Sequence, residues 1–84
     1  MMKNYKVNKS DLNDLQKIVD KKYEKYGIGT YKVKAKAYDR CKISKETNTY
    51  IEFEKTDDTY ASWIAIVVEA PDTTDVEILE NIYF

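Results

Sequence analysis

Apolar positions recur at three- and four-residue spacing from residue 10 to residue 26, which predicts one amphipathic helix. Ser10 stands where a cap would begin this helix, and Gly27 stands where a helix commonly ends. The apolar stripe would pack on a core, and the opposite, charged face would lie in solvent. The residues of the expected stripe are Leu12, Leu15, Ile18, Val19, Tyr23 and Tyr26.

Regular alternation of apolar and polar residues predicts two half-buried strands, at 30–39 and 47–55. We expect these strands to pair antiparallel across a loop at 40–46, because this pairing sets the lysines of one opposite the glutamates of the other. A slip by one residue would bury charged side chains and is excluded. The opposed pairs would be Lys36 with Glu52, Lys34 with Glu54 and Ala37 with Ile51.

The last third of the chain supplies two more candidate strands. The stretch 60–70 reads as one strand, and 76–84 begins as another. Thr74 and Glu77 also resemble a helix capping box, so a helix from residue 76 is the alternative. We favour a strand, because a three-stranded sheet would leave residues 63–68 poorly protected at its edge.

Together these elements predict an α+β domain of two layers, in which one long N-terminal helix packs on a four-stranded antiparallel sheet. A short strand at 3–7 would make the sheet five-stranded. Because the chain has 84 residues, we expect a single domain, residues 1–84.

The run Trp-Ile-Ala-Ile-Val-Val at residues 63–68 is more apolar than a strand with one solvent face requires. One helix covers one face of a sheet, so either the odd- or the even-numbered members would face away from it. Three explanations stay open: the C-terminal segment folds over that face, strong curvature buries both sides, or the patch is an interface with a second copy or another protein. Tyr and Trp are common interface anchors, which points to Trp63 with the outward-facing Tyr38 and Tyr50.

Charge is unevenly distributed along the chain, although the net charge is only −1. Residues 1–44 hold twelve Lys and Arg against five Asp and Glu, whereas residues 45–84 hold two against ten. Pairing across the sheet explains part of this asymmetry, and the remaining acids would suit a positively charged partner. The acidic residues expected at a partner-binding surface are Glu69, Asp72, Asp75, Glu77 and Glu80.

The composition argues against an enzyme, a metal site and a cofactor. The chain has no His, which removes the commonest general base and the commonest metal ligand. It has no glycine-rich phosphate loop. Its single cysteine, Cys41, is expected to be an inert thiol beside surface cations. We therefore expect no catalytic residue, no metal ligand and no cofactor.

The sequence also predicts a cytoplasmic protein. The N-terminal stretch MMKNYKVNKSDLN is polar and unlike a signal peptide. The longest apolar run is six residues, against about 20 needed to span a bilayer. One unpaired cysteine fits a reducing compartment, so we expect no membrane partner.

A basic strand face offers a different function. Lysines alternate along the strand at 30–39 and lead to Tyr38, an arrangement that could follow the phosphates of single-stranded nucleic acid. The acidic pI of about 5.4 and the glutamates of the next strand argue against it, so direct nucleic-acid binding is not favoured. The residues of this alternative site are Lys32, Lys34, Lys36 and Arg40.

The stretches LQKIVDKKYEKYG, TNTYIEFEK and YASWIAIVVEAPDTTDVEIL resemble the layout of the cystatins. In that family a long helix precedes four antiparallel strands, with a proline-containing loop before the last, so the resemblance implies a cystatin-like fold. AYD at residues 37–39 and YASWIAIVV at residues 60–68 are similar to strands of the phage uracil-DNA glycosylase inhibitor family. That family resembles DNA through an acidic strand edge.

Both resemblances imply a small inhibitor that occupies the working surface of another protein. The hypothesis is a protein-binding module, encoded by a phage or mobile element, that inhibits a nucleic-acid-handling enzyme partly by acidic mimicry of DNA. One rival is a homo-oligomeric structural module, in which the same face meets its own copy about a two-fold axis. The other rival is the single-stranded nucleic-acid binder described above.

Overall fold

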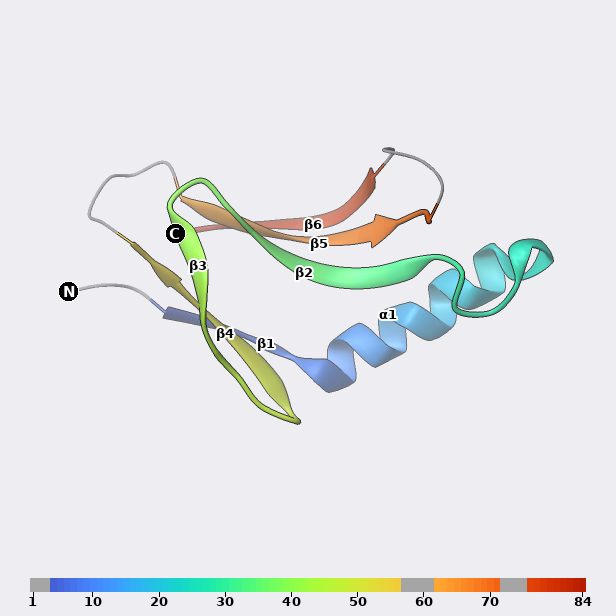
Figure 1. Cartoon of the computed structure of the whole chain (residues 1–84), viewed down its shortest axis with the longest axis horizontal. Helices are drawn as coiled ribbons and strands as arrows, with labels where there is room; N and C mark the ends of the chain where they lie inside the picture. Colours follow the sequence, from blue (N-terminus) through green and yellow to red (C-terminus); the bar gives the residue numbers. More distant parts are fainter. Residues whose placement is uncertain (1–3, 57–61, 72–75) are drawn as a thin grey trace.

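The computed structural model describes residues 4–56, 62–71 and 76–84, which form one α-helix and six strands (Figure 1). All strand pairs are antiparallel, which confirms the α+β class. The elements in chain order are β1 (Asn4–Asn8), α1 (Lys9–Lys22), a 3-10 helix (Glu24–Tyr26), β2 (Lys32–Tyr38), β3 (Cys41–Glu46), β4 (Tyr50–Lys55), β5 (Trp63–Glu69) and β6 (Val76–Tyr83).

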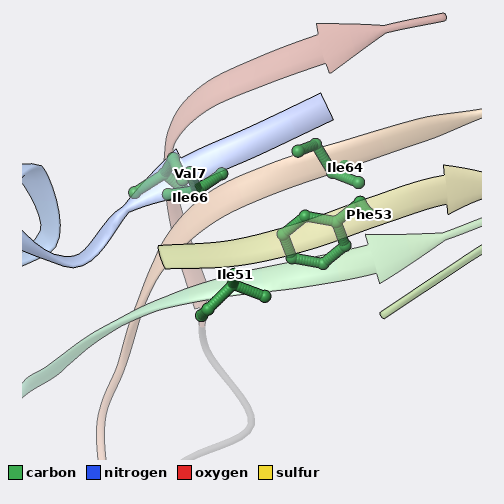
Figure 2. Packing of buried hydrophobic residues seen from close by; sticks show 5 residues of the cluster. All are labelled: Val7, Ile51, Phe53, Ile64 and Ile66. Atoms are coloured by element: carbon green, nitrogen blue, oxygen red, sulfur yellow. The ribbon is translucent and has the colours of Figure 1, made fainter. Parts of the chain in front are cut away.

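The strands form two three-stranded sheets rather than the single sheet of four or five strands expected from the sequence. One sheet has the order β1-β4-β3 and the other β2-β5-β6. The core lies between them: Figure 2 shows Val7, Ile51 and Phe53 of the first sheet with Ile64 and Ile66 of β5. Phe53 and Ile64 have no exposed surface, and burying one such side chain stabilises the fold by about 2–3 kcal/mol.

The expected pairing of 30–39 with 47–55 is wrong, because a tight turn follows β2. Asp39 and Arg40 have φ angles of 41° and 62°. Two successive residues in the left-handed region are typical of a two-residue turn that reverses the chain direction. The expected loop at 40–46 is therefore strand β3. As a result β4 lies between β1 and β3, and β2 pairs with β5.

The expected matching of lysines with glutamates occurs, but between other strands. Lys42 of β3 pairs with Glu54 of β4 at 3.1 Å. Lys34 pairs with Glu69 of β5 at 3.1 Å instead of with Glu54. Exposed pairs of this kind add little stability, so they do not decide which strands meet.

Helix α1 is shorter than the predicted helix at 10–26, and it is preceded by a strand. Its leucines pack against the core, but Ile18 is 64% exposed and lies off that face. The α-helix ends at Lys22, a 3-10 helix follows at Glu24–Tyr26, and Gly27 caps it with φ 100°. Within the described ranges, no helix is long and apolar enough to cross a bilayer.

Residues 76–83 are a strand, as favoured from the sequence, and the helical alternative is wrong. The β5–β6 register shifts at one point, because Ile78 lies opposite Val67 while Glu80 lies opposite Ile66. Leu79 is thus the extra residue of a β-bulge. Beyond it every β6 residue is displaced by one position, which places Tyr83 on the face opposite to the one that simple alternation from Ile78 would give.

The apolar run at 63–68 is mostly buried by its own chain. Ile64 and Ile66 belong to the core between the sheets, and Val68 lies on the same side of the strand in the register. Ala65 and Val67 lie on the opposite face in the register but have no exposed surface, and their cross-strand neighbours are Lys36 with Asn81 and Lys34 with Ile78. Of the three open explanations, an interface is therefore not needed to bury residues 64–68, whereas Trp63 is only half-buried.

Candidate partner-binding surface

The face of the β2-β5-β6 sheet that points away from the core is the candidate site, and we call it the outer face. Its members follow from the strand register and the alternation of side chains along each strand. They are Lys32, Lys34, Lys36 and Tyr38 of β2, Trp63, Ala65, Val67 and Glu69 of β5, and Ile78, Asn81 and Tyr83 of β6.

Three aromatic residues cross one end of the outer face, and we call them the aromatic row. Tyr38, Trp63 and Tyr83 lie directly opposite one another on the three strands. The Tyr38 and Trp63 rings stack with centroids 4.3 Å apart and planes 12° apart, and the Tyr83 ring lies 6.4 Å from Trp63. Tyr83 is 71% exposed. The row thus presents aromatic surface across the full width of the sheet.

The β2 lysines give the outer face a positive charge. Lys34 and Lys36 both form ion pairs with Glu69, whereas Lys32 stands opposite Glu69 in the register without an ion pair in the described part of the chain. Hydrogen bonds from Lys36 and then Lys34 lower the pKa of Glu69, and the bond to Glu69 raises the pKa of Lys36. Three cations against one carboxylate leave the described outer face net positive.

Two of the predicted acidic residues lie on the other side of this sheet. Glu77 faces the helix, where the Lys22 ammonium and the Tyr23 hydroxyl donate hydrogen bonds to it at 3.2 and 3.1 Å. These hydrogen bonds lower the pKa of the Glu77 carboxyl, Lys22 having the larger effect. Glu80 lies beside the first turns of the helix rather than on the outer face. The structure therefore separates these acids from the aromatic row.

Tyr50 and Arg40 also lie off the outer face. Tyr50 belongs to β4 of the other sheet, where the Lys6 ammonium lies 4.5 Å from its ring centroid. Arg40 lies in the turn between β2 and β3, and its carbonyl accepts hydrogen bonds from the backbone and hydroxyl of Thr56. The other two predicted acids, Asp72 and Asp75, lie outside the described residues.

The structure thus gathers part of the predicted partner site and most of the alternative basic site on one face. It also adds two residues that sequence reasoning missed, Tyr83 and Ile78, which are 71% and 52% exposed. Alternation alone puts these two on opposite faces, and only the bulge at Leu79 brings them together. The sequence carries no mark of that bulge. The predicted residues that the outer face gathers are Lys32, Lys34, Lys36, Tyr38, Trp63 and Glu69.

Metal-ligand groups and the single cysteine bear on chemistry in the described ranges. No group of three or more His, Cys, Asp and Glu there could hold a metal ion. Burial raises the pKa of the Cys41 thiol above its ordinary value. The thiol is thus protonated at neutral pH, the less nucleophilic form. Aromatic, aliphatic and cationic groups dominate the outer face.

Comparison of the chain with protein-family models, with curated proteins and with solved structures finds no match. The likeness to cystatins and to uracil-DNA glycosylase inhibitors remains an expectation from the sequence. Function is therefore inferred from the outer face itself.

Proposed function

We propose that this protein is a non-enzymatic binding module that recognises a partner protein through its outer face. The observation that carries this proposal is the aromatic row, with a ring on each strand and Tyr83 71% exposed at its end. Tyrosine and tryptophan supply large contact area at low entropic cost and are enriched among the residues that dominate binding energy. The lysines beside the row suit a partner surface that carries carboxylates.

The aromatic row fits a protein surface better than a series of nucleic-acid bases. A base stacks on an open ring face, but Tyr38 and Trp63 already cover one face of each other. Two of the lysines that would bind phosphates, Lys34 and Lys36, already form ion pairs with Glu69. The alignment of three lysines with Tyr38 on one strand still favours single-stranded nucleic acid as the second candidate.

A second copy of this chain is a poor occupant of the outer face. Face-to-face dimerisation about a two-fold axis brings the same patch against itself. The three lysines of one copy would then approach those of the other, with one glutamate on each side to offset them. We therefore propose a monomer in solution, which sedimentation at micromolar concentration tests directly.

The proposed consequence of binding is inhibition, because a domain that covers an acidic working surface of its partner excludes that partner's other ligands. This proposal retains inhibition, but recognition now depends on aromatic residues and lysines rather than on acidic residues. Acidic mimicry is not part of the proposal, because Glu69 and Glu77 are each engaged by lysines and lie on opposite sides of the sheet.

The test compares partner capture by the tagged full-length chain and by three variants. Trp63→Ala and Tyr83→Ala remove two members of the aromatic row, and Tyr50→Ala removes an aromatic ring from the other sheet as a matched control. We expect wild type and Tyr50→Ala to capture the same protein from bacterial lysate. Capture by the row variants should weaken by about 30-fold, the effect of a 2 kcal/mol anchor. Because Tyr83 is exposed, its loss should leave the unfolding midpoint nearly unchanged.

A captured set that is insensitive to Trp63→Ala and Tyr83→Ala would show that the outer face is not the binding surface. The second candidate has a separate readout. Salt-dependent binding of a labelled single-stranded oligonucleotide that is lost on Lys34→Gln with Lys36→Gln would assign the face to nucleic acid instead.

A further inference from the structure

The two sheets leave an open seam between β1 and β6. Within the described part of the chain, each of these strands has a partner on one side only, β4 for β1 and β5 for β6. The free edge of β2 is different, because the Gln16 side chain of the helix donates to the Tyr31 carbonyl at 2.7 Å and accepts from the Val33 amide at 2.9 Å. The Gln16 amide thus satisfies backbone groups at the edge of β2, whereas no described side chain is seen to do the same at the seam between β1 and β6.

A hollow of about 80 Å³ is lined by residues of β1 and β6 together with the helix and β5. Tyr5 contributes to its lining, and the centroid of the Tyr5 ring lies 6.2 Å from that of the Phe84 ring. Since one water occupies about 30 Å³ of the liquid, the hollow has room for the stem of one long side chain. Its apolar lining is formed by Val7, Leu12, Leu15, Ile66 and Ile82.

Two carboxylates stand on the rim of the seam hollow, Asp11 from the helix and Glu80 from β6. Neither forms an ion pair with another described residue. Lys6 also lines the hollow, but its ammonium is turned to the Tyr50 ring on the neighbouring strand. The hollow therefore combines an apolar floor with an acidic rim whose charge is not neutralised.

A side chain that complements both features has an aliphatic stem and a cationic head. Arginine fits better than lysine, because its planar guanidinium can donate to carboxylates on two different elements at once. We propose that the seam hollow receives one arginine side chain of a partner protein, presented on an extended segment beside the free edge of β6. This site is independent of the proposed function, because it lies on the opposite side of the β2-β5-β6 sheet from the aromatic row.

The test is a ¹H–¹⁵N titration of the full-length chain with the capped peptide acetyl-Val-Arg-Val-amide. We expect saturable shifts at residues that line the hollow, with a dissociation constant of about 1 mM. The citrulline peptide, which has the same shape without the charge, should bind about tenfold more weakly. Glu80→Gln should cause a similar loss, and Glu24→Gln, a carboxylate remote from the hollow, should cause none.

Equal binding of the arginine and citrulline peptides would overturn the proposal, and so would full affinity in Glu80→Gln or no shift at about 10 mM peptide. Asp11→Asn supplies a second rim variant if Glu80→Gln alters the spectrum of the free protein. Trp63→Ala should leave the peptide titration unchanged, so that failure of the seam site and failure of the outer-face proposal are told apart.

Discussion

The two faces of strand β5 are both buried, but by different means. On the core side Ile64 and Ile66 meet the other sheet and the helix, as Figure 2 shows for the contact with Val7 and Phe53. On the outer face Ala65 and Val67 have no exposed surface, yet they point away from that core. Their cross-strand neighbours are Lys36 with Asn81 and Lys34 with Ile78, and long side chains in such positions can bury a small neighbour under their stems while their polar ends stay in solvent.

This difference teaches that an unbroken apolar strand does not by itself call for a partner. Small or β-branched residues in a central strand can be buried by the stems of lysines and by aliphatic neighbours within one sheet. What remains exposed at the end of β5 is aromatic, and it is confined to the row at Trp63. The surface that supports an interface is therefore smaller than the six-residue run suggests, and it is defined by the aromatic row.

The largest expected effect belongs to the core side. Phe53 is completely buried between the sheets, so Phe53→Ala leaves a cavity that both sheets must close. We expect a loss of about 3–5 kcal/mol in the free energy of unfolding, measured by urea titration. A loss under about 1 kcal/mol would mean that the two sheets do not share one core.

The sharpest comparison is a matched pair of valines in β5. Val68 and Val67 are adjacent and 3% and 0% exposed, but face the core side and the outer face respectively. Val68→Ala should cost about 2 kcal/mol, because the packed layer cannot relax into the space. Val67→Ala should cost about 1 kcal/mol, since the Lys34 and Ile78 side chains can move inward. Equal losses in urea unfolding would remove the proposed difference between the faces.

Substitutions in the aromatic row should change the free energy of unfolding less than the core substitutions do, but they should clearly change the fluorescence of Trp63. Trp63 is the only tryptophan, so its emission reports on the stack directly. Tyr38→Ala removes the stacked ring and should shift Trp63 emission to longer wavelength, with a loss of about 1 kcal/mol. Tyr83→Ala should shift the emission less, because its ring lies farther away. An unchanged spectrum in Tyr38→Ala would show that the two rings do not stack in solution.

The smallest expected effect is on the pH dependence of stability, to which one carboxyl on each face of the sheet contributes. Lysine partners lower the pKa of Glu69 on the outer face and of Glu77 on the core side. A carboxyl with a lowered folded pKa stabilises the protein above its ordinary pKa, and this contribution is lost as pH falls through the folded value. We therefore expect Glu69→Gln and Glu77→Gln each to flatten the acid limb of stability against pH. A limb of unchanged slope in both variants would show that these pairs do not persist in solution.

The sequence predicts the elements of this fold better than their pairing. Alternation places Ile51 and Phe53 in the core correctly, and the strand chosen for residues 76–84 is confirmed. The prediction of strand partners fails because charge complementarity is not selective. Any strand with lysines at every second position complements any strand with glutamates at the same spacing. The segment at 41–46 reads as a loop because it holds only one strongly apolar residue, Ile43, and that residue is 49% exposed.

The candidate site is predictable only in part, for a similar reason. Tyr38 and Trp63 are recognisable from the sequence as outward aromatic residues, but their neighbour Tyr83 depends on a single extra residue in β6. Acidic residues were expected together because they are close in sequence. The structure separates Glu69 from Glu77, since the two lie on opposite faces of adjacent strands.

The pairing of β1 with β4 also has a consequence for how the chain acquires its structure. The hairpins β3–β4 and β5–β6 join neighbouring segments and can close within about 1–10 μs. Strand β1 and strand β2 instead meet partners far along the chain, and the Lys9 amide at the start of α1 donates to the Thr49 carbonyl, just before β4, at 2.8 Å. Such non-local closure is slow, on the order of milliseconds to seconds. During that interval the apolar side of the β5–β6 hairpin is open to solvent, which makes the unassembled hairpin the species most prone to self-association.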